Sequence, residues 1–152
     1  MELEDSFMNA ALIKNTYLFR DIAAGDLSAL AEIVEEKDLM AGNLIYDAGE
    51  DSDAIFIIEM GTVDIIPQGK DIPFATMGNG QSLGELAFFY PDKRVATALT
   101  RERTQFLRIP FDKLTRLVAE RPSFGLILYR NASTFLAKHL REMALELNHR
   151  YF

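Results

Sequence analysis

Between residues 37 and 110, short apolar segments recur at intervals of about 8–12 residues, and turn-forming residues separate them. Two examples are Ala54 to Ile58 and Thr62 to Ile66, which flank Gly61. Many short strands at this spacing are typical of antiparallel sandwiches and barrels, because each strand returns along a neighbour after a tight connection. We therefore predict a mainly β fold, an eight-stranded antiparallel β-roll similar to a jelly-roll barrel, with a tight turn or bulge at Gly61.

Helices are predicted on both sides of the β region. Asp26 is a suitable N-cap for a helix from Leu27 to Glu36, and Asp112 is one for a helix from Lys113 to Glu120. The chain has 152 residues, which is about the length of one domain, and it contains no internal repeat or low-complexity segment. We expect a single domain over residues 1–152, with N-terminal helices at 1–36, the β-roll at 37–110 and C-terminal helices at 111–148.

The last helix is predicted from about Ser123 to Leu147, with Pro122 in its first turn. Its apolar residues are three or four positions apart, close to a heptad pattern: Leu128, Ala132, Leu136, Leu140, Met143 and Leu147. This pattern leaves two interpretations open. The helix lies on its own β core, or it forms a two-helix dimer seam, because about 25 helical residues are longer than a small barrel can cover.

The stretch from Gly80 to Thr97 carries groups suited to a binding site. Gly84 lets the backbone approach a ligand closely, and a helical turn from Glu85 to Phe89 can point free N–H groups at an anion. Arg94, nine residues after Glu85, offers a planar fork of donors that matches phosphate oxygens, while Glu85 can accept from a sugar hydroxyl. The stretch therefore predicts a pocket for a small anion that also carries a hydroxyl.

The residues present give little support to other chemistry. The formal net charge is −7 and no basic face is visible, so we expect no nucleic-acid binding by this chain alone. Both histidines, His139 and His149, lie in the predicted C-terminal helices, so the strands cannot supply a histidine metal site. The acidic loop at 47–53 lacks the spacing of an EF-hand and is interpreted as solvated. We predict no metal, no cofactor and no enzyme activity.

The compartment follows from what the sequence lacks. It has no cysteine, no signal peptide and no apolar run near the roughly 18–20 residues of a membrane-spanning helix. We therefore expect a cytoplasmic protein without a membrane span.

The N-terminal helices, the strand pattern, the glycine–glutamate–arginine stretch and the long closing helix together resemble the cyclic nucleotide-binding domain family. That family includes regulatory subunits of cyclic AMP-dependent protein kinase, bacterial catabolite activator proteins and cyclic nucleotide-gated channels. The resemblance covers about Leu18 to Leu147 and includes glycines at two further family positions, Gly49 and Gly61. Its most specific part is Gly-Glu-Leu-Ala at 84–87, with an arginine nine residues after the glutamate. The chain departs from the family with Leu83 in place of a frequent phenylalanine.

The resemblance implies a role for each part of the site. Glu85 would accept from the ribose 2′-hydroxyl, and Arg94 would bind the cyclic phosphate. Three residues would add backbone N–H donors to the phosphate: Leu86, Ala87 and Ala96. Three apolar residues would line the purine and sugar pocket: Ile65, Phe74 and Leu83. The closing helix would supply a lid over the base, from Asn131, Phe135 and His139.

Val95 bears on which base is bound. Family members selective for cyclic GMP often carry a threonine directly after the arginine, where its hydroxyl meets the guanine, and valine has no such group. We therefore expect a regulatory sensor that binds a 3′,5′-cyclic mononucleotide, cyclic AMP in preference to cyclic GMP. The closing helix would act as lid and output toward a second copy, an effector domain or a protein partner. The alternative is a degenerate member that serves as a dimerisation or docking module without nucleotide.

Overall fold

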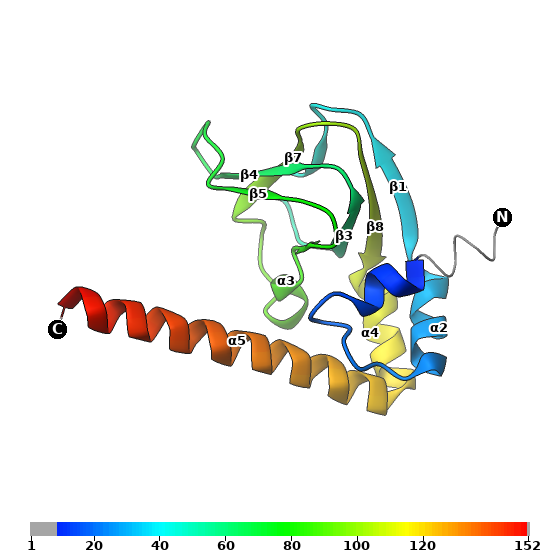
Figure 1. Ribbon diagram of the computed structural model, residues 1–152. Helices are drawn as coiled ribbons and strands as arrows, with labels where there is room; N and C mark the ends of the chain where they lie inside the picture. The colour runs from blue at the N-terminus through cyan, green and yellow to red at the C-terminus, as the bar shows by residue number, and fades with distance from the viewer. Residues whose placement is uncertain (1–8, 152) are drawn as a thin grey trace.

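The computed structural model of the protein describes residues 9–151, which contain eight strands in two four-stranded antiparallel sheets (Figure 1). The first sheet contains, in spatial order, β1 (Glu35–Leu39), β8 (Thr104–Pro110), β3 (Ala54–Met60) and β6 (Ser82–Leu83). The second contains β2 (Leu44–Tyr46), β7 (Ala96–Thr100), β4 (Val63–Pro67) and β5 (Ala75–Met77). The predicted eight-stranded antiparallel β-roll is confirmed.

Helices precede and follow the roll, as predicted. A short helix at 9–14 and α2 (Ala24–Ile33) come before β1, and α3 (Leu86–Phe89) lies between β6 and β7. After β8 come α4 (Phe111–Glu120) and the long α5 (Pro122–Tyr151), which begins at the expected proline. In Figure 1, α2, α4 and the start of α5 lie together beneath the first sheet, and α5 then extends beyond the roll. No helix within residues 9–151 is both long and apolar enough to cross a membrane.

The boundary predicted between the N-terminal helices and the roll is wrong. The helix predicted from Leu27 to Glu36 instead spans Ala24–Ile33, and its N-cap position is Ala23. Asp26 lies inside the first turn, where its carboxylate accepts from Arg121 Nη1 at 3.0 Å rather than capping the helix. The polar residues after the helix form β1 because their backbone pairs with β8, an interaction that local sequence does not reveal.

The C-terminal helix α4 also begins earlier than predicted. Pro110 occupies the N-cap position, and Phe111 is the first helical residue. Asp112, the predicted cap, lies in the first turn and accepts from the backbone N–H of Lys113 at 2.8 Å. An acidic residue there still complements the helix dipole.

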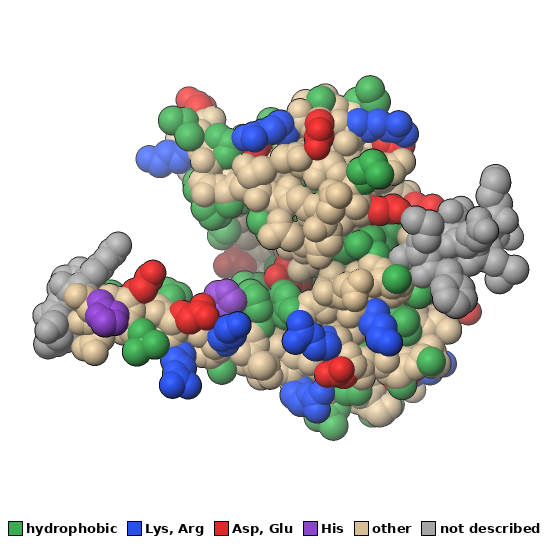
Figure 2. Space-filling model, in the orientation of Figure 1, with side chains coloured by type: hydrophobic (Ala, Val, Ile, Leu, Met, Phe, Trp, Pro, Cys, Tyr) green, Lys and Arg blue, Asp and Glu red, His purple; other side chains and the backbone are tan. Residues whose placement is uncertain are grey.

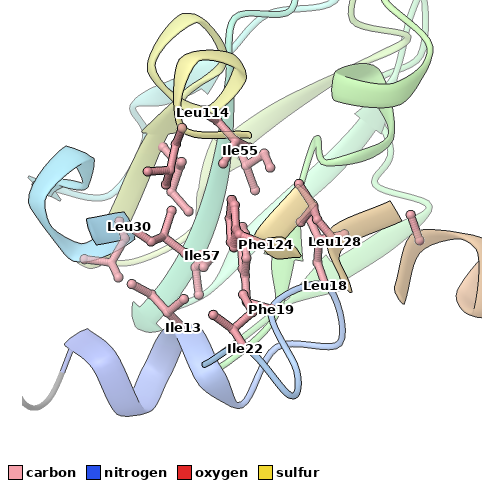
Figure 3. Close-up of a cluster of buried hydrophobic side chains, with 14 residues drawn as sticks. Ile13, Leu18, Phe19, Ile22, Leu30, Ile55, Ile57, Leu114, Phe124 and Leu128 are labelled. Carbon is pink, nitrogen blue, oxygen red and sulfur yellow. The ribbon is translucent and has the colours of Figure 1, made fainter. Parts of the chain in front are cut away.

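Strand β3 forms the wall between two hydrophobic clusters. Its first five residues are all buried, and because successive side chains point to opposite faces, Ile55 and Ile57 face the helices while Phe56 and Ile58 face the roll interior. On the helical side, Ile13, Leu18 and Phe19 pack with Phe124 and Leu128 of α5, among other residues (Figure 3). The first half of α5 is thereby fixed to the same core that supports the sheet.

The two halves of α5 have different surroundings. Leu128 is fully buried and Ala132 is 3% exposed, so the first part of the predicted apolar stripe lies on the chain's own core. Farther along, the stripe is exposed: Leu140 is 65% exposed and Met143 is 59% exposed. Figure 2 shows hydrophobic side chains on this distal part of α5 and a hollow between it and the roll.

Candidate functional site

The stretch from Gly80 to Thr97 contains β6, the short helix α3, a loop and the first two residues of β7. Glu85 directly precedes α3 and makes no side-chain cap, so its carboxylate is available to other partners. The backbone N–H of Phe88 donates to the carbonyl of Glu85 at 3.1 Å, which closes the short helical turn that we predicted. We call residues 80–97 the cassette.

Backbone hydrogen bonds join the cassette loop to the loop that contains Gly49, one of the two further glycines of the family resemblance. The backbone N–H of Arg94 donates to the carbonyl of Glu50 at 2.7 Å, and the N–H of Gly49 donates to the carbonyl of Arg94 at 2.8 Å. Lys93 and Asp51 add an ion pair of 3.1 Å beside these bonds. The fold thus joins two motifs that lie far apart in the sequence and uses them to fix the backbone of Arg94.

Arg94 extends into the roll and is only 6% exposed. Its Nη2 donates to the carbonyl of Ala54 at 2.8 Å, and its Nη1 donates to the carbonyl of Gly84 at 3.4 Å. The guanidinium carbon lies 4.2 Å from the ring centroid of Tyr46 and 5.6 Å from that of Phe56, within the range of cation–π attraction. The guanidinium is therefore held by neutral groups on several sides.

The charge of Arg94 is incompletely compensated. Among the residues that the structure describes, no carboxylate lies within 4.0 Å of the guanidinium, and the buried Nε has no hydrogen-bond partner. Burial lowers the pKa of Arg94, although arginine keeps its charge in proteins. A buried cation with an unused donor is costly, and a bound anion would relieve that cost.

Gly84 is required by this position of the guanidinium. Its φ is +74°, in the left-handed region that glycine adopts without steric cost, and a Cβ atom there would collide with Arg94 Nη1. The glycine of the Gly-Glu pair therefore makes room for the arginine that follows ten positions later.

Glu85 has a partner that sequence reasoning missed. Its Oε1 accepts a 2.8 Å hydrogen bond from the hydroxyl of Tyr17, and the Tyr17 ring stacks on Phe135 of α5 with centroids 4.0 Å apart. Burial raises the pKa of Glu85, opposed by the backbone N–H of Glu85, the Tyr17 hydrogen bond and the Arg94 charge. Burial next to this carboxylate also raises the pKa of Tyr17, which therefore remains a donor at neutral pH. Glu85 and Arg94 form no ion pair with each other.

Some of the apolar residues predicted around the ligand are buried, and others are exposed. Ile65, Leu83 and Ala96 belong to the cluster inside the roll. Phe74 and Val95 are 70% and 79% exposed, and the backbone N–H of Phe74 donates to the carbonyl of Ile65 at 3.0 Å. Their contact with a purine stays a prediction, as do the phosphate contacts of Leu86, which is 45% exposed, and of the half-buried Ala87.

The three predicted lid residues lie on one side of α5 but differ in their contacts. The Asn131 amide donates to the carbonyls of Leu18 and Arg20 at 2.9 and 2.8 Å, so it fastens α5 to the N-terminal segment. Phe135 lies between the rings of Tyr17 and His139, each with its centroid 4.0 Å away. Of the three, Phe135 is the one that touches the partner of Glu85, and the lid role stays a prediction.

A cleft lies beside Tyr46 and Phe56, the two aromatic residues that contact Arg94, but it suits an anion poorly. Tyr46, Phe56 and Phe106 line it together with several carboxylates: Glu35, Asp38, Glu50, Asp51 and Asp53. These carboxylates outnumber the two basic residues that line the cleft, Lys37 and Arg108, so the cleft disfavours phosphate. The residues that the structure describes also contain no cluster of three or more His, Asp or Glu side chains suited to a metal ion.

Known proteins show the same domain. The family model described as Cyclic nucleotide-binding domain matches residues 36–121. The chain is 30% identical over 119 residues to the cAMP-dependent protein kinase regulatory subunit of Debaryomyces hansenii, covering 77% of this chain and 26% of that protein. It is 28% identical over 127 residues to the CRP-like cAMP-activated global transcriptional regulator of Mycobacterium tuberculosis, covering 82% of this chain and 55% of that protein. The chain thus spans only part of the length of either relative.

A solved structure agrees with these sequence matches. The cyclic nucleotide-binding domain from Methylobacillus flagellatus has a TM-score of 0.77 and 18% identity, and the match covers 98% of this chain and 85% of that one. At this identity the likeness shows the fold alone. The matching family segment spans more than half of the 152 residues and contains the whole cassette with Glu85 and Arg94. From the fold, the cassette and this match, the chain belongs to the cyclic nucleotide-binding domain family.

Proposed function

We propose that this chain is a regulatory, non-catalytic sensor domain that binds a 3′,5′-cyclic mononucleotide, cyclic AMP in preference to cyclic GMP. The observation that carries the proposal is the buried, incompletely compensated guanidinium of Arg94. It lies next to Gly84 and is followed in sequence by exposed Val95. A cyclic phosphate would supply the missing anion.

Each of the remaining groups would contact a different part of the ligand. Glu85 would accept from the ribose 2′-hydroxyl, and the N–H groups of Leu86, Ala87 and Ala96 would support the phosphate. Ile65, Phe74 and Leu83 would contact the purine and sugar. Because Val95 offers no hydroxyl to a guanine, we assign adenine as the preferred base. Both curated relatives carry cAMP in their names, which supports this preference.

Calorimetry with cyclic AMP, cyclic GMP and a cyclic dinucleotide tests this function. We expect cyclic AMP to bind at micromolar concentration or below, cyclic GMP to bind more weakly and the dinucleotide not to bind. Thermal melting on the same samples would show that the protein is folded. If none of the three ligands binds to folded protein at micromolar levels, the sensor proposal is wrong and the nucleotide-free docking module becomes the better one.

We also propose that the distal part of α5 is a dimer seam between two copies of the chain, or the surface that reaches an effector. Leu140 and Met143 continue a stripe whose first members, Leu128 and Ala132, are buried in the chain's own core. Their exposure favours a partner that covers them. The exposed stripe is also the observation that favours the docking-module alternative. We place this sensor in the cytoplasm.

Light scattering tests the seam. We expect the wild type to be a dimer, and Leu140→Glu to shift it toward monomer, since a carboxylate in an apolar seam lacks a partner. Leu145→Glu is the matched control, because Leu145 is on the same helix and similarly exposed but lies outside the stripe. A wild type that remains monomeric across the concentrations tested, with or without cyclic AMP, would contradict the dimer seam.

A further inference from the structure

The hydroxyl of Tyr17 is hydrogen-bonded to the Glu85 carboxylate, which we assign to the ligand's 2′-hydroxyl. It donates to Glu85 Oε1 at 2.8 Å, an ordinary O–H···O hydrogen-bond length. The two residues are 68 positions apart in the sequence, so the contact is created by the fold rather than by a local turn. An incoming hydroxyl therefore meets a carboxylate that already holds a donor.

Tyr17 is held in place from several directions. Its ring stacks nearly parallel on Phe135, with an interplanar angle of 13°. Asn131 of α5 donates to the carbonyls of Leu18 and Arg20, which lie one and three residues after Tyr17. Leu18 is fully buried in the helical core. The phenol is therefore a positioned donor and not a side chain that rests on the carboxylate by chance.

We propose that the Tyr17 hydroxyl competes with the ligand's 2′-hydroxyl for the Glu85 carboxylate, and so limits the affinity of the site and its selectivity for that hydroxyl. This inference rests on the proposed function. In the wild type, a ligand with a 2′-hydroxyl either displaces the phenol from Glu85 Oε1 or shares with it a carboxylate whose charge the Tyr17 bond already partly satisfies, so its net gain is reduced. A 2′-deoxy ligand leaves the Tyr17–Glu85 bond intact, so the hydroxyl contributes little net affinity.

The same contact links the cassette to the closing helix. Figure 1 shows the N-terminal segment turning beside α3 and above α5, and Tyr17 contacts Glu85, directly before α3, and Phe135 of α5. Because the hydroxyl and the ring belong to one rigid side chain, displacement of the phenol from Glu85 also acts on its stack with Phe135. Tyr17 thus connects Glu85, the proposed partner of the ligand's sugar, to α5.

The test compares Tyr17→Phe with the wild type, using cyclic AMP and 2′-deoxy cyclic AMP in calorimetry. In the wild type, we expect cyclic AMP to bind less than about fivefold better than the deoxy ligand. Tyr17→Phe keeps the ring stack and removes only the competing donor, so its affinity for cyclic AMP should rise by about three- to tenfold. Its preference for cyclic AMP over the deoxy ligand should rise by about tenfold, because Glu85 then depends on the ligand for a donor.

Two further variants locate the effect at Glu85. Tyr129→Phe removes a hydroxyl from a tyrosine whose ring touches Phe89, and should leave both affinities unchanged. In a Glu85→Ala background, Tyr17→Phe should give no gain. Weaker binding of cyclic AMP by Tyr17→Phe would show that Tyr17 orients Glu85, and an unchanged 2′-hydroxyl preference would show no competition. Either result overturns the inference while leaving the proposed function intact, whereas a wild type that binds no cyclic nucleotide overturns both.

Discussion

Replacing Arg94 with alanine should weaken cyclic AMP binding by about 2–4 kcal/mol, roughly 30- to 1,000-fold. The guanidinium is buried, and no described carboxylate pairs with it, so a bound phosphate would make a charge-assisted contact in a poorly solvated place. Alanine removes that contact and leaves the phosphate desolvated without a cation. Calorimetry at one fixed salt concentration measures the loss, since the net charge of −7 makes the affinity depend on salt.

Two variants make this result specific. Arg94→Lys keeps a positive charge but loses the planar fork, so its affinity should fall between those of the wild type and Arg94→Ala. Arg101→Ala is the matched surface control, because Arg101 is largely exposed and pairs with Asp64 on the roll. It should bind cyclic AMP as the wild type does. Nearly unchanged affinity in folded Arg94→Ala would show that the phosphate binds elsewhere.

The strands and the cassette turn could be predicted because their signals are local. Apolar runs bounded by Gly, Asn and Asp identify strands without knowledge of their partners. The start of β1 was predicted two residues late, at 37, because Glu35 to Leu39 is mostly polar and directly follows a helix. It is a strand because it pairs with β8, and the ion pair of Glu35 with Arg108 at 3.1 Å reinforces that register. Such cross-strand stabilisation depends on residues some seventy positions away.

The same distinction applies to the candidate site. Glu85 and Arg94 lie nine positions apart around a glycine turn, so a sequence pattern suffices to propose them. Tyr46 and Tyr17 lie on other elements, and no spacing in the sequence connects either one to the cassette. Tyr17 falls within the predicted helical region 1–36, although in the structure it follows the 9–14 helix and donates to Glu85. The residues proposed to bind a ligand could thus be named from the sequence, whereas the tyrosines that contact them could not.

Gly61→Ala should destabilise the protein by about 3–4 kcal/mol and lower its melting temperature by roughly 10 °C. Gly61 follows β3 at the predicted turn and has a φ of +127°, which side-chain-bearing residues rarely adopt. An added Cβ would collide with the Thr104 hydroxyl and lie 2.7 Å from Thr104 Cα and 2.8 Å from the Arg103 carbonyl oxygen. Two of these are backbone atoms at the start of β8, the strand that pairs with β3, so they cannot move aside without disturbing the sheet.

Gly69→Ala is the control for the collision at Gly61. Gly69 also has a positive φ, +74°, but an added Cβ would meet no atom within 4 Å. Its substitution should therefore cost only the left-handed conformation, about 1–2 kcal/mol. Denaturant unfolding of both variants gives, as the difference between the two losses, the cost of the collision at Gly61 together with the greater backbone strain of its φ of +127°. Equal losses would mean that the β3–β4 turn can shift away from β8, and that close packing there is not what requires a glycine.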